Sequence, residues 1–207
     1  MQNIEIKINT KEKIFEKSIE LFSRKGCNGV SMRQIAKEVG IKESSIYNHY
    51  KSKDELIDSI FDYFLSSIKN YRPSDLELNK MMDYMSPEDL LKHLVVSYGR
   101  SLNGKLDSIA MIIYSEQFKN EKAKKLMLEC ILKEPSTYIT KLLNMMMEKN
   151  LIKKVDTVLV AEEYNNRLVA ITFEYAHAVN NREDTGLIIK KMFNHINFIC
   201  KYLMLMK

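Results

Sequence analysis

The 207-residue chain contains few of the residues that interrupt helices or close turns. It has only 6 Gly and 3 Pro, which is low against the average usage of both residues. Short strands need such residues in the turns that join them, so their scarcity argues against a fold of many strands. Because 45% of the residues are apolar, the chain can still fill a core. The composition therefore predicts long helices.

Cysteines and long apolar runs are also scarce. Cys27, Cys130 and Cys200 lie far apart and form no Cys-x-x-Cys pair, which argues against a disulfide framework or a zinc site. No apolar run reaches the roughly 18 residues of a membrane-spanning helix. The first residues lack a basic segment followed by an apolar stretch, so we expect no signal peptide. The sequence predicts a cytoplasmic protein with reduced thiols and no membrane partner.

The positive charge of the chain is unevenly distributed. Residues 1–53 hold 11 Lys and Arg against 6 Asp and Glu, whereas residues 54–207 hold 21 of each. The entire net charge of +5 therefore lies in the first quarter. Such an asymmetry is typical of a polyanion-binding segment attached to a neutral body. A basic surface that only faces solvent would give the same count, so the charge alone leaves both interpretations open.

Helix start and stop signals recur along the chain, and we expect no sheet. Thr10 is the candidate N-cap of the first helix, which Gly26 ends. Arg72-Pro73-Ser74-Asp75 is the clearest break, and Pro135 is expected either to kink or to split a later helix. The predicted helices span about 10–25, 31–40, 43–50, 53–71, 87–102, 105–118, 121–149, 157–179 and 184 to near the end.

Residues 31–53 have the layout of a helix-turn-helix. Ala36 is small where two helices would cross, and Gly40 tolerates the positive φ of a tight turn. Ile46 and Tyr50 lie four residues apart, so both should face inward. The polar residues around them are then free to meet DNA. We expect Lys42, Glu43, Ser44, Ser45 and Asn48 near the bases, and Tyr47, His49, Lys51 and Lys53 near the phosphates.

Residues 10–56 resemble the N-terminal region of the TetR family of transcriptional regulators. The matches occur at fixed spacing, which makes them more specific than one short motif. They are Thr10, Ile14, Leu21-Phe22, Gly26, Ser31, Ile35-Ala36, Gly40, Tyr47-Asn48-His49-Tyr50, Lys51-Ser52-Lys53 and Leu56. Ser18-Ile19 departs from a usual pair of alanines, and Cys27 from a common aromatic residue, which affects local packing. Ser44 stands where glycine is frequent, which bears on base preference.

The resemblance implies roles for the matching residues. It implies base contacts from Arg33, Ser44 and Ser45, and phosphate contacts from Ser31, Tyr47, His49 and Lys53. Glu43 lies where some relatives read a base, and a carboxylate there can accept a hydrogen bond from cytosine. Two alternatives stay open, because Ser31 also caps its helix and His49 can pack without touching DNA.

For residues 54–207 the resemblance implies a ligand pocket among the middle helices. The thirteen Met residues suit an adaptable apolar cavity, although each candidate is also a plausible core residue. The candidates are Tyr98, Tyr114, Glu116, Phe118, Tyr138, Met145, Met146, Phe173 and His177. Glu116 follows an apolar run and is a candidate partner for a cationic or hydrogen-bonding ligand. No second His or Cys stands at ligand spacing from His177, so we expect no metal site.

The last predicted helix is apolar over most of its circumference, which is wider than one core-facing stripe. A second buried face would be supplied by a twofold four-helix interface with residues 157–179, and the resemblance also implies dimerisation through the last two helices. The candidate interface residues are Leu168, Ile171, Tyr175, Ile189, Phe193, Ile196 and Cys200. An ordinary central core helix is the alternative.

Together these observations predict an all-α protein. Its expected parts are an N-terminal three-helix DNA-binding domain, residues 1–53, and a helical-bundle ligand-binding and dimerisation domain, residues 54–207. The expected function is that of a homodimeric repressor released from a palindromic operator on double-stranded DNA by an unknown small-molecule effector. The alternative is a regulator without a small ligand, controlled by a protein partner or by abundance. The chain has no Gly-rich phosphate loop, nucleophile motif or carboxylate–histidine pair, so we expect neither catalysis nor a cofactor.

Overall fold

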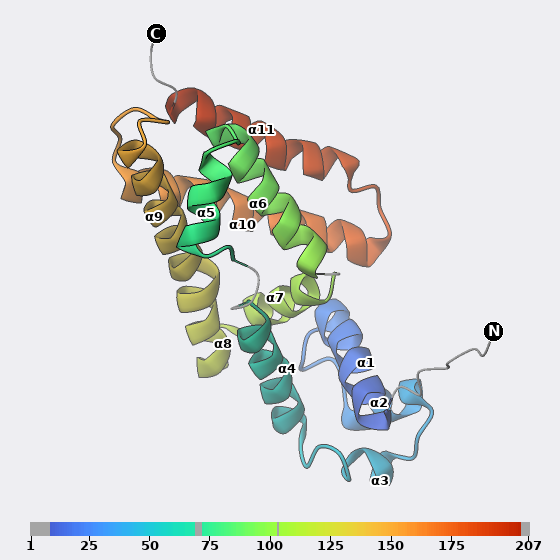
Figure 1. Cartoon of the computed structure of the whole chain (residues 1–207). Coiled ribbons are helices and arrows are strands. Elements are labelled where there is room, and N and C mark those ends of the chain that lie inside the picture. The colour runs from blue at the N-terminus through green and yellow to red at the C-terminus, as the bar shows by residue number, and fades with distance from the viewer. Residues whose placement is uncertain (1–8, 69–71, 103, 204–207) are drawn as a thin grey trace, which may run out of the picture.

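The computed structural model describes residues 9–68, 72–102 and 104–203. Every regular element in these ranges is a helix, so the predicted all-α fold class is confirmed for the described part of the chain. Figure 1 shows the first three helices at one end of the molecule and the last two helices toward the other. None of the described helices combines the length and the apolar character that spanning a bilayer requires.

The first three helices, which we call the head, form the predicted helix-turn-helix unit. They are α1 (Thr10–Lys25), α2 (Met32–Val39) and α3 (Glu43–Ile46). Ser31 caps α2, because its hydroxyl oxygen accepts a hydrogen bond from the Gln34 amide at 3.2 Å. Gly40 turns the chain toward α3 with a φ of 78°, a conformation that glycine adopts without strain. Asn9 caps α1 by accepting from the Lys11 amide at 3.2 Å, so the cap lies one residue before the predicted one.

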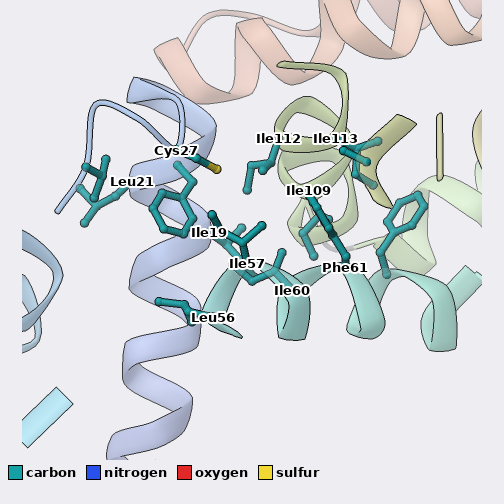
Figure 2. Close-up of a cluster of buried hydrophobic side chains, with 14 of the residues drawn as sticks. Ile19, Leu21, Cys27, Leu56, Ile57, Ile60, Phe61, Ile109, Ile112 and Ile113 are labelled. Carbon is teal, nitrogen blue, oxygen red and sulfur yellow. The ribbon is translucent and has the colours of Figure 1, made fainter. Parts of the chain in front are cut away.

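Two helices join the head to the rest of the chain, α4 (Lys53–Ile68) and α7 (Lys105–Glu116). The Ser52 hydroxyl starts α4 by accepting from the Glu55 amide at 3.1 Å. One apolar cluster runs from α1 across α4 to α7 (Figure 2), so the head shares its core with both helices. The central side chains of this cluster are at most 1% exposed: Phe22, Leu56, Ile60, Phe61, Ile109 and Ile112.

A second apolar cluster lies among α6 (Pro87–Leu102), α9 (Glu134–Glu148), α10 (Thr157–Asn181) and α11 (Gly186–Leu203). The short helix α5 (Asp75–Met82) contributes Leu78 to it. The sequence reading treated this region only as a break and missed α5. Its start is a capping box, in which Ser74 accepts from the Glu77 amide and the Glu77 carboxylate accepts from the Ser74 amide at 2.8 Å.

The region around Pro135 is neither a simple kink nor a split. The chain passes from α8 (Glu121–Lys125) through a π-helical segment, η1 (Leu126–Lys133), directly into α9. Pro135 has no amide hydrogen, so it cannot donate to the Ile131 carbonyl four residues earlier. Asn165 of α10 supplies donors instead, from its side-chain amide to the Ile131 oxygen at 3.3 Å and to the Leu132 oxygen at 3.0 Å. A buried polar side chain thus stabilises the widened helix.

Candidate nucleic-acid interface and central cavity

The helix α3 is anchored by apolar residues and shows its polar residues to solvent. Ile46 is fully buried and Tyr50 is 4% exposed, as their four-residue spacing predicts. The side chains that the sequence assigns to base contacts lie largely on the outside. Arg33, Lys42, Glu43, Ser44 and Asn48 are exposed, and Ser45 is half-buried. The head therefore offers DNA a short polar edge on a rigid apolar support.

The residues assigned to phosphates surround this edge. Tyr47 keeps 45% of its surface exposed, and His49 is half-buried. Ser31 caps α2 with its oxygen, but its hydroxyl hydrogen is still free to donate, so capping and phosphate binding are compatible. The phosphate roles of these residues stay predictions, because the structure holds no DNA.

Lys53 has a role inside the protein that the sequence did not indicate. Its ammonium donates to the carbonyl oxygens of Cys27 at 2.9 Å and Val30 at 3.3 Å. These carbonyls belong to the turn between α1 and α2, so Lys53 fastens the start of α4 to the head. A phosphate contact by Lys53 would share an ammonium that already serves two acceptors.

Glu116 holds the same turn from the opposite side. Its carboxylate, at the end of α7, accepts a hydrogen bond from the Cys27 amide at 3.3 Å. Burial, followed by the charge of Glu116, raises the pKa of the Cys27 thiol to about 12, so this cysteine stays a neutral thiol. The turn is thus fixed by Lys53 at two carbonyls and by Glu116 at one amide, and it links the head to both α4 and α7.

A cavity of about 520 Å³ lies in the body of the protein. Side chains from α4, α6, α7, η1, α9, α10 and α11 line it, and most of them are apolar or aromatic. Volume and lining are typical of a small-molecule site. Tyr138 at the rim donates to the Pro73 carbonyl at 3.3 Å, and the Arg72 guanidinium lies over its ring, 5.3 Å from the centroid.

Asp107, in the first turn of α7, also lines the cavity. Asp107 is only 8% exposed. No hydrogen bond or ion pair joins its carboxylate to any residue that the structure describes. Burial raises the pKa of this carboxyl to about 6. Burial, and then the nearby Asp107 charge, raise the pKa of Tyr98 to about 12. The cavity therefore contains a carboxylate without a counter-ion among the described residues.

The head matches a known family. Residues 14–60 fit the model described as bacterial regulatory proteins, tetR family. This part of the chain is similar to the tetR family. The matching segment begins within α1 and ends within α4, so it covers most of the head and the first half of the helix that carries Lys53.

Curated relatives match over part of the chain. The biofilm operon icaADBC negative transcriptional regulator IcaR of Staphylococcus epidermidis is 30% identical over 79 residues, which are 36% of this chain and 43% of that protein. The uncharacterized HTH-type transcriptional regulator YerO of Bacillus subtilis is 28% identical over 109 residues, or 50% of this chain and 35% of that protein. The chain thus spans less than half the length of these relatives.

Solved structures of transcriptional regulators have a fold similar to that of the whole described chain. A tetR-family regulator from Mesorhizobium loti is similar with a TM-score of 0.65 and 16% identity, over 95% of this chain and 97% of that one. The ketosteroid transcriptional regulator KstR2 of Mycobacterium tuberculosis gives a TM-score of 0.61 and 15% identity, over 96% of both chains. At such identities the similarity concerns the fold alone.

The structure divides the predicted pocket residues into two groups. Tyr98, Tyr138 and Phe173 line the cavity. The others lie elsewhere: Tyr114 packs against Phe173 with ring centroids 4.6 Å apart, Glu116 holds the Cys27 turn, Phe118 is 87% exposed, His177 is exposed, and Met145 and Met146 pack in the second apolar cluster. The sequence reading missed Asp107, because an acid near a helix start is ordinary and nothing local signals a cavity.

The predicted dimer residues also separate into groups. Ile171, Ile196 and Cys200 are at most 3% exposed within the single chain, so they have no free surface for a partner. Leu168, Tyr175, Ile189 and Phe193 line the cavity. Ile189 is also 39% exposed, and it is the one predicted interface residue that α11 exposes. The sequence analysis did not select the more exposed apolar residues of α11, which are Leu187, Phe198 and Tyr202 at 73%, 71% and 55%.

The raised pKa of Asp107 predicts a pH-dependent effect on stability. The folded pKa of about 6 exceeds the ordinary value of 3.8, so the folded state favours the protonated carboxyl. The contribution of the neutral Asp107 carboxyl to the free energy of unfolding is then complete below about pH 4, and it is lost as the pH rises through 6. We compare the free energy of unfolding of the Asp107→Asn variant with that of the unaltered protein. This difference should shift by about 2–3 kcal/mol in favour of the variant between pH 4 and pH 8. Urea unfolding at several pH values measures this, and a pH-independent difference would contradict it.

Proposed function

We propose that this chain is a homodimeric transcriptional regulator that represses by binding a palindromic operator and leaves it when a small molecule fills the body. The observation that carries the proposal is the exposed polar edge of α3, held by buried Ile46 and Tyr50 within a tetR-family segment. The net charge of +5 in residues 1–53 supports binding to a polyanion. The printed role of IcaR as a negative regulator favours repression. In this proposal residues 1–53 bind DNA, and residues 54–207 bind the effector and the second copy.

Two heads must act together in this proposal. A palindrome is read by two recognition helices about 34–36 Å apart, which is one turn of DNA. The second copy would be held by the exposed apolar residues of α11 and its neighbour α10. A twofold axis between two such pairs brings the same face of each copy together. The change of spacing between the heads then controls DNA affinity.

The path from cavity to head is short. Asp107 lines the cavity near the first turn of α7, and Glu116 at the other end of α7 holds the Cys27 turn of the head. A ligand that favours another position of α7 would shift the turn and with it the head. The loss of DNA affinity is limited to the difference in ligand affinity between the two conformations.

The alternative is a regulator that binds DNA without any small ligand. The cavity of about 520 Å³ favours the effector version, since cores normally leave few voids larger than a water molecule. Loss of DNA binding on addition of a metabolite extract fraction would separate the two.

The direct test of DNA binding is its salt dependence. A dimer that neutralises about six or more phosphates should lose roughly a thousandfold in affinity between 50 and 200 mM salt. Fluorescence anisotropy of a labelled duplex gives the slope. A slope near zero would contradict binding through a basic head.

A further inference from the structure

We propose that the cavity takes an apolar molecule with a positively charged nitrogen, and that the Asp107 carboxylate binds this nitrogen. The proposal rests on the effector cavity of the proposed function and names the class of ligand. Only two of the described residues lining the cavity carry a full charge, Arg72 and Asp107. The ligand class follows from how differently these two charges are compensated.

Arg72 already has partners. Its guanidinium lies 3.8 Å from the Glu134 carboxylate and over the ring of Tyr138, with 5.3 Å to the centroid. Arg72 therefore needs no anion from a ligand. It also exerts no resolved effect on the pKa of Asp107, for which burial is the single cause of the rise. The charge of Asp107 is thus left for the contents of the cavity.

A buried carboxylate without a partner is costly, and the cost falls when a cation enters beside it. Asp107 is 92% withdrawn from solvent, being 8% exposed, so a cationic head placed there would meet little competition from bulk water. A neutral ligand would leave the carboxylate uncompensated, and an anionic one would add repulsion. The Asp107 carboxylate thus favours cationic ligands over neutral and anionic ones.

The rest of the lining suits the same ligand. Aromatic rings attract a desolvated ammonium through their negative faces. Seven aromatic residues line the cavity from several helices: Phe64, Tyr98, Tyr138, Tyr164, Phe173, Tyr175 and Phe193. Leucine, isoleucine and valine side chains complete the wall and would bury an alkyl or aryl body. A carboxylate within an aromatic wall favours a quaternary or protonated amine over a simple metal cation.

The test compares three probes that share one chain and differ in the head group. They are decyltrimethylammonium, decanoate and decan-1-ol, titrated by calorimetry into the full-length protein at pH 7.5. We expect the ammonium to bind at least tenfold more tightly than either of the others. Equal affinity for all three would reduce the site to an apolar void and overturn the proposal, and tighter binding of decanoate would assign the site to Arg72. No binding by any probe would also overturn it.

Two variants sharpen the test. Asp107→Asn should lower the ammonium affinity at least tenfold and leave the decanol affinity unchanged. Asp83→Asn is the matched control, because Asp83 is an exposed acid that pairs with Lys149 at 2.6 Å and does not line the cavity. An Asp107→Asn protein that still prefers the ammonium would overturn the proposal. If that variant does not fold, the comparison of the three probes on the unaltered protein still decides.

The same preparation separates this proposal from the proposed function. Its DNA binding is measured without probes. DNA binding with no preference for the ammonium overturns the ligand class alone. A preference for the ammonium with no DNA binding overturns the regulator and keeps the site.

Discussion

Replacing Tyr47 with alanine should weaken binding to every DNA sequence about a hundredfold. Tyr47 is 45% exposed beside the polar edge of α3, where its hydroxyl can donate to a phosphate. A hydrogen bond to a charged group contributes about 1.5 kcal/mol at the low end, and a dimer makes the contact twice. About 3 kcal/mol corresponds to roughly a hundredfold in the dissociation constant. Anisotropy titrations with specific and unrelated duplexes measure it.

Matched variants isolate this effect. Tyr84→Ala removes another exposed tyrosine, which is 73% exposed and lies outside the head. This variant should change the affinity for DNA little. Tyr47→Phe should lose most of the DNA affinity that Tyr47→Ala loses, since the hydroxyl makes the contact. Ser45→Ala should instead alter the preference between sequences. If Tyr47→Ala behaved like Tyr84→Ala, the assigned phosphate contact would be refuted.

Replacing Phe198 with glutamate should separate the dimer. Phe198 and Tyr202 follow Leu187 along α11 by 11 and 15 residues, which is about three and four helical turns. The three side chains therefore share one outward face. Phe198 is 71% exposed in the single chain and would be buried by the second copy. An uncompensated buried charge costs about 3–5 kcal/mol, and the twofold axis introduces two. The dimer dissociation constant should rise at least about a thousandfold, and DNA affinity should fall with it.

The control for this variant is another exposed phenylalanine. Phe118→Glu changes a side chain that is 87% exposed and lies just beyond the end of α7, outside α10 and α11 in the sequence, and should leave the dimer intact. Ile196→Glu is a poor test, because Ile196 is fully buried within the chain and its replacement should unfold the protein. Analytical ultracentrifugation reads both. An unchanged dimer of Phe198→Glu would move the interface to another face.

The head was predictable from the sequence because its determinants are local. Ser31 and Gln34 form a cap within four residues, and Gly40 marks the turn that follows. The spacing of Ile46, which ends α3, and Tyr50, four residues later, indicates which side of this segment is buried, although α3 is shorter than the predicted helix over 43–50. Such signals need no knowledge of distant contacts. The helix α5 had an equally local signal in Ser74 and Glu77, and it was missed because the segment was read only as a break.

The cavity and the outer face of α11 were not predictable in the same way. Apolar residues cover most of α11, so periodicity cannot tell Ile196, which is buried, from Phe198, which is exposed. Asp107 resembles any acid at a helix start, and only the packing of helices distant in sequence leaves it beside a void. The roles of Lys53 and Glu116 at the Cys27 turn depend on contacts 26 and 89 residues away. These features arise from tertiary packing.

Binding of DNA by two heads is best tested by selecting bound fragments from a pool of random duplex DNA. We expect enrichment of an inverted repeat whose half-sites lie about one helical turn apart, or a multiple of it, because two heads related by a twofold axis read it. Sequencing of the bound fraction reports motif, symmetry and spacing together. A bound fraction with no enriched sequence, or no retention of duplex above that by a neutral control protein, would refute sequence-specific DNA binding by the head.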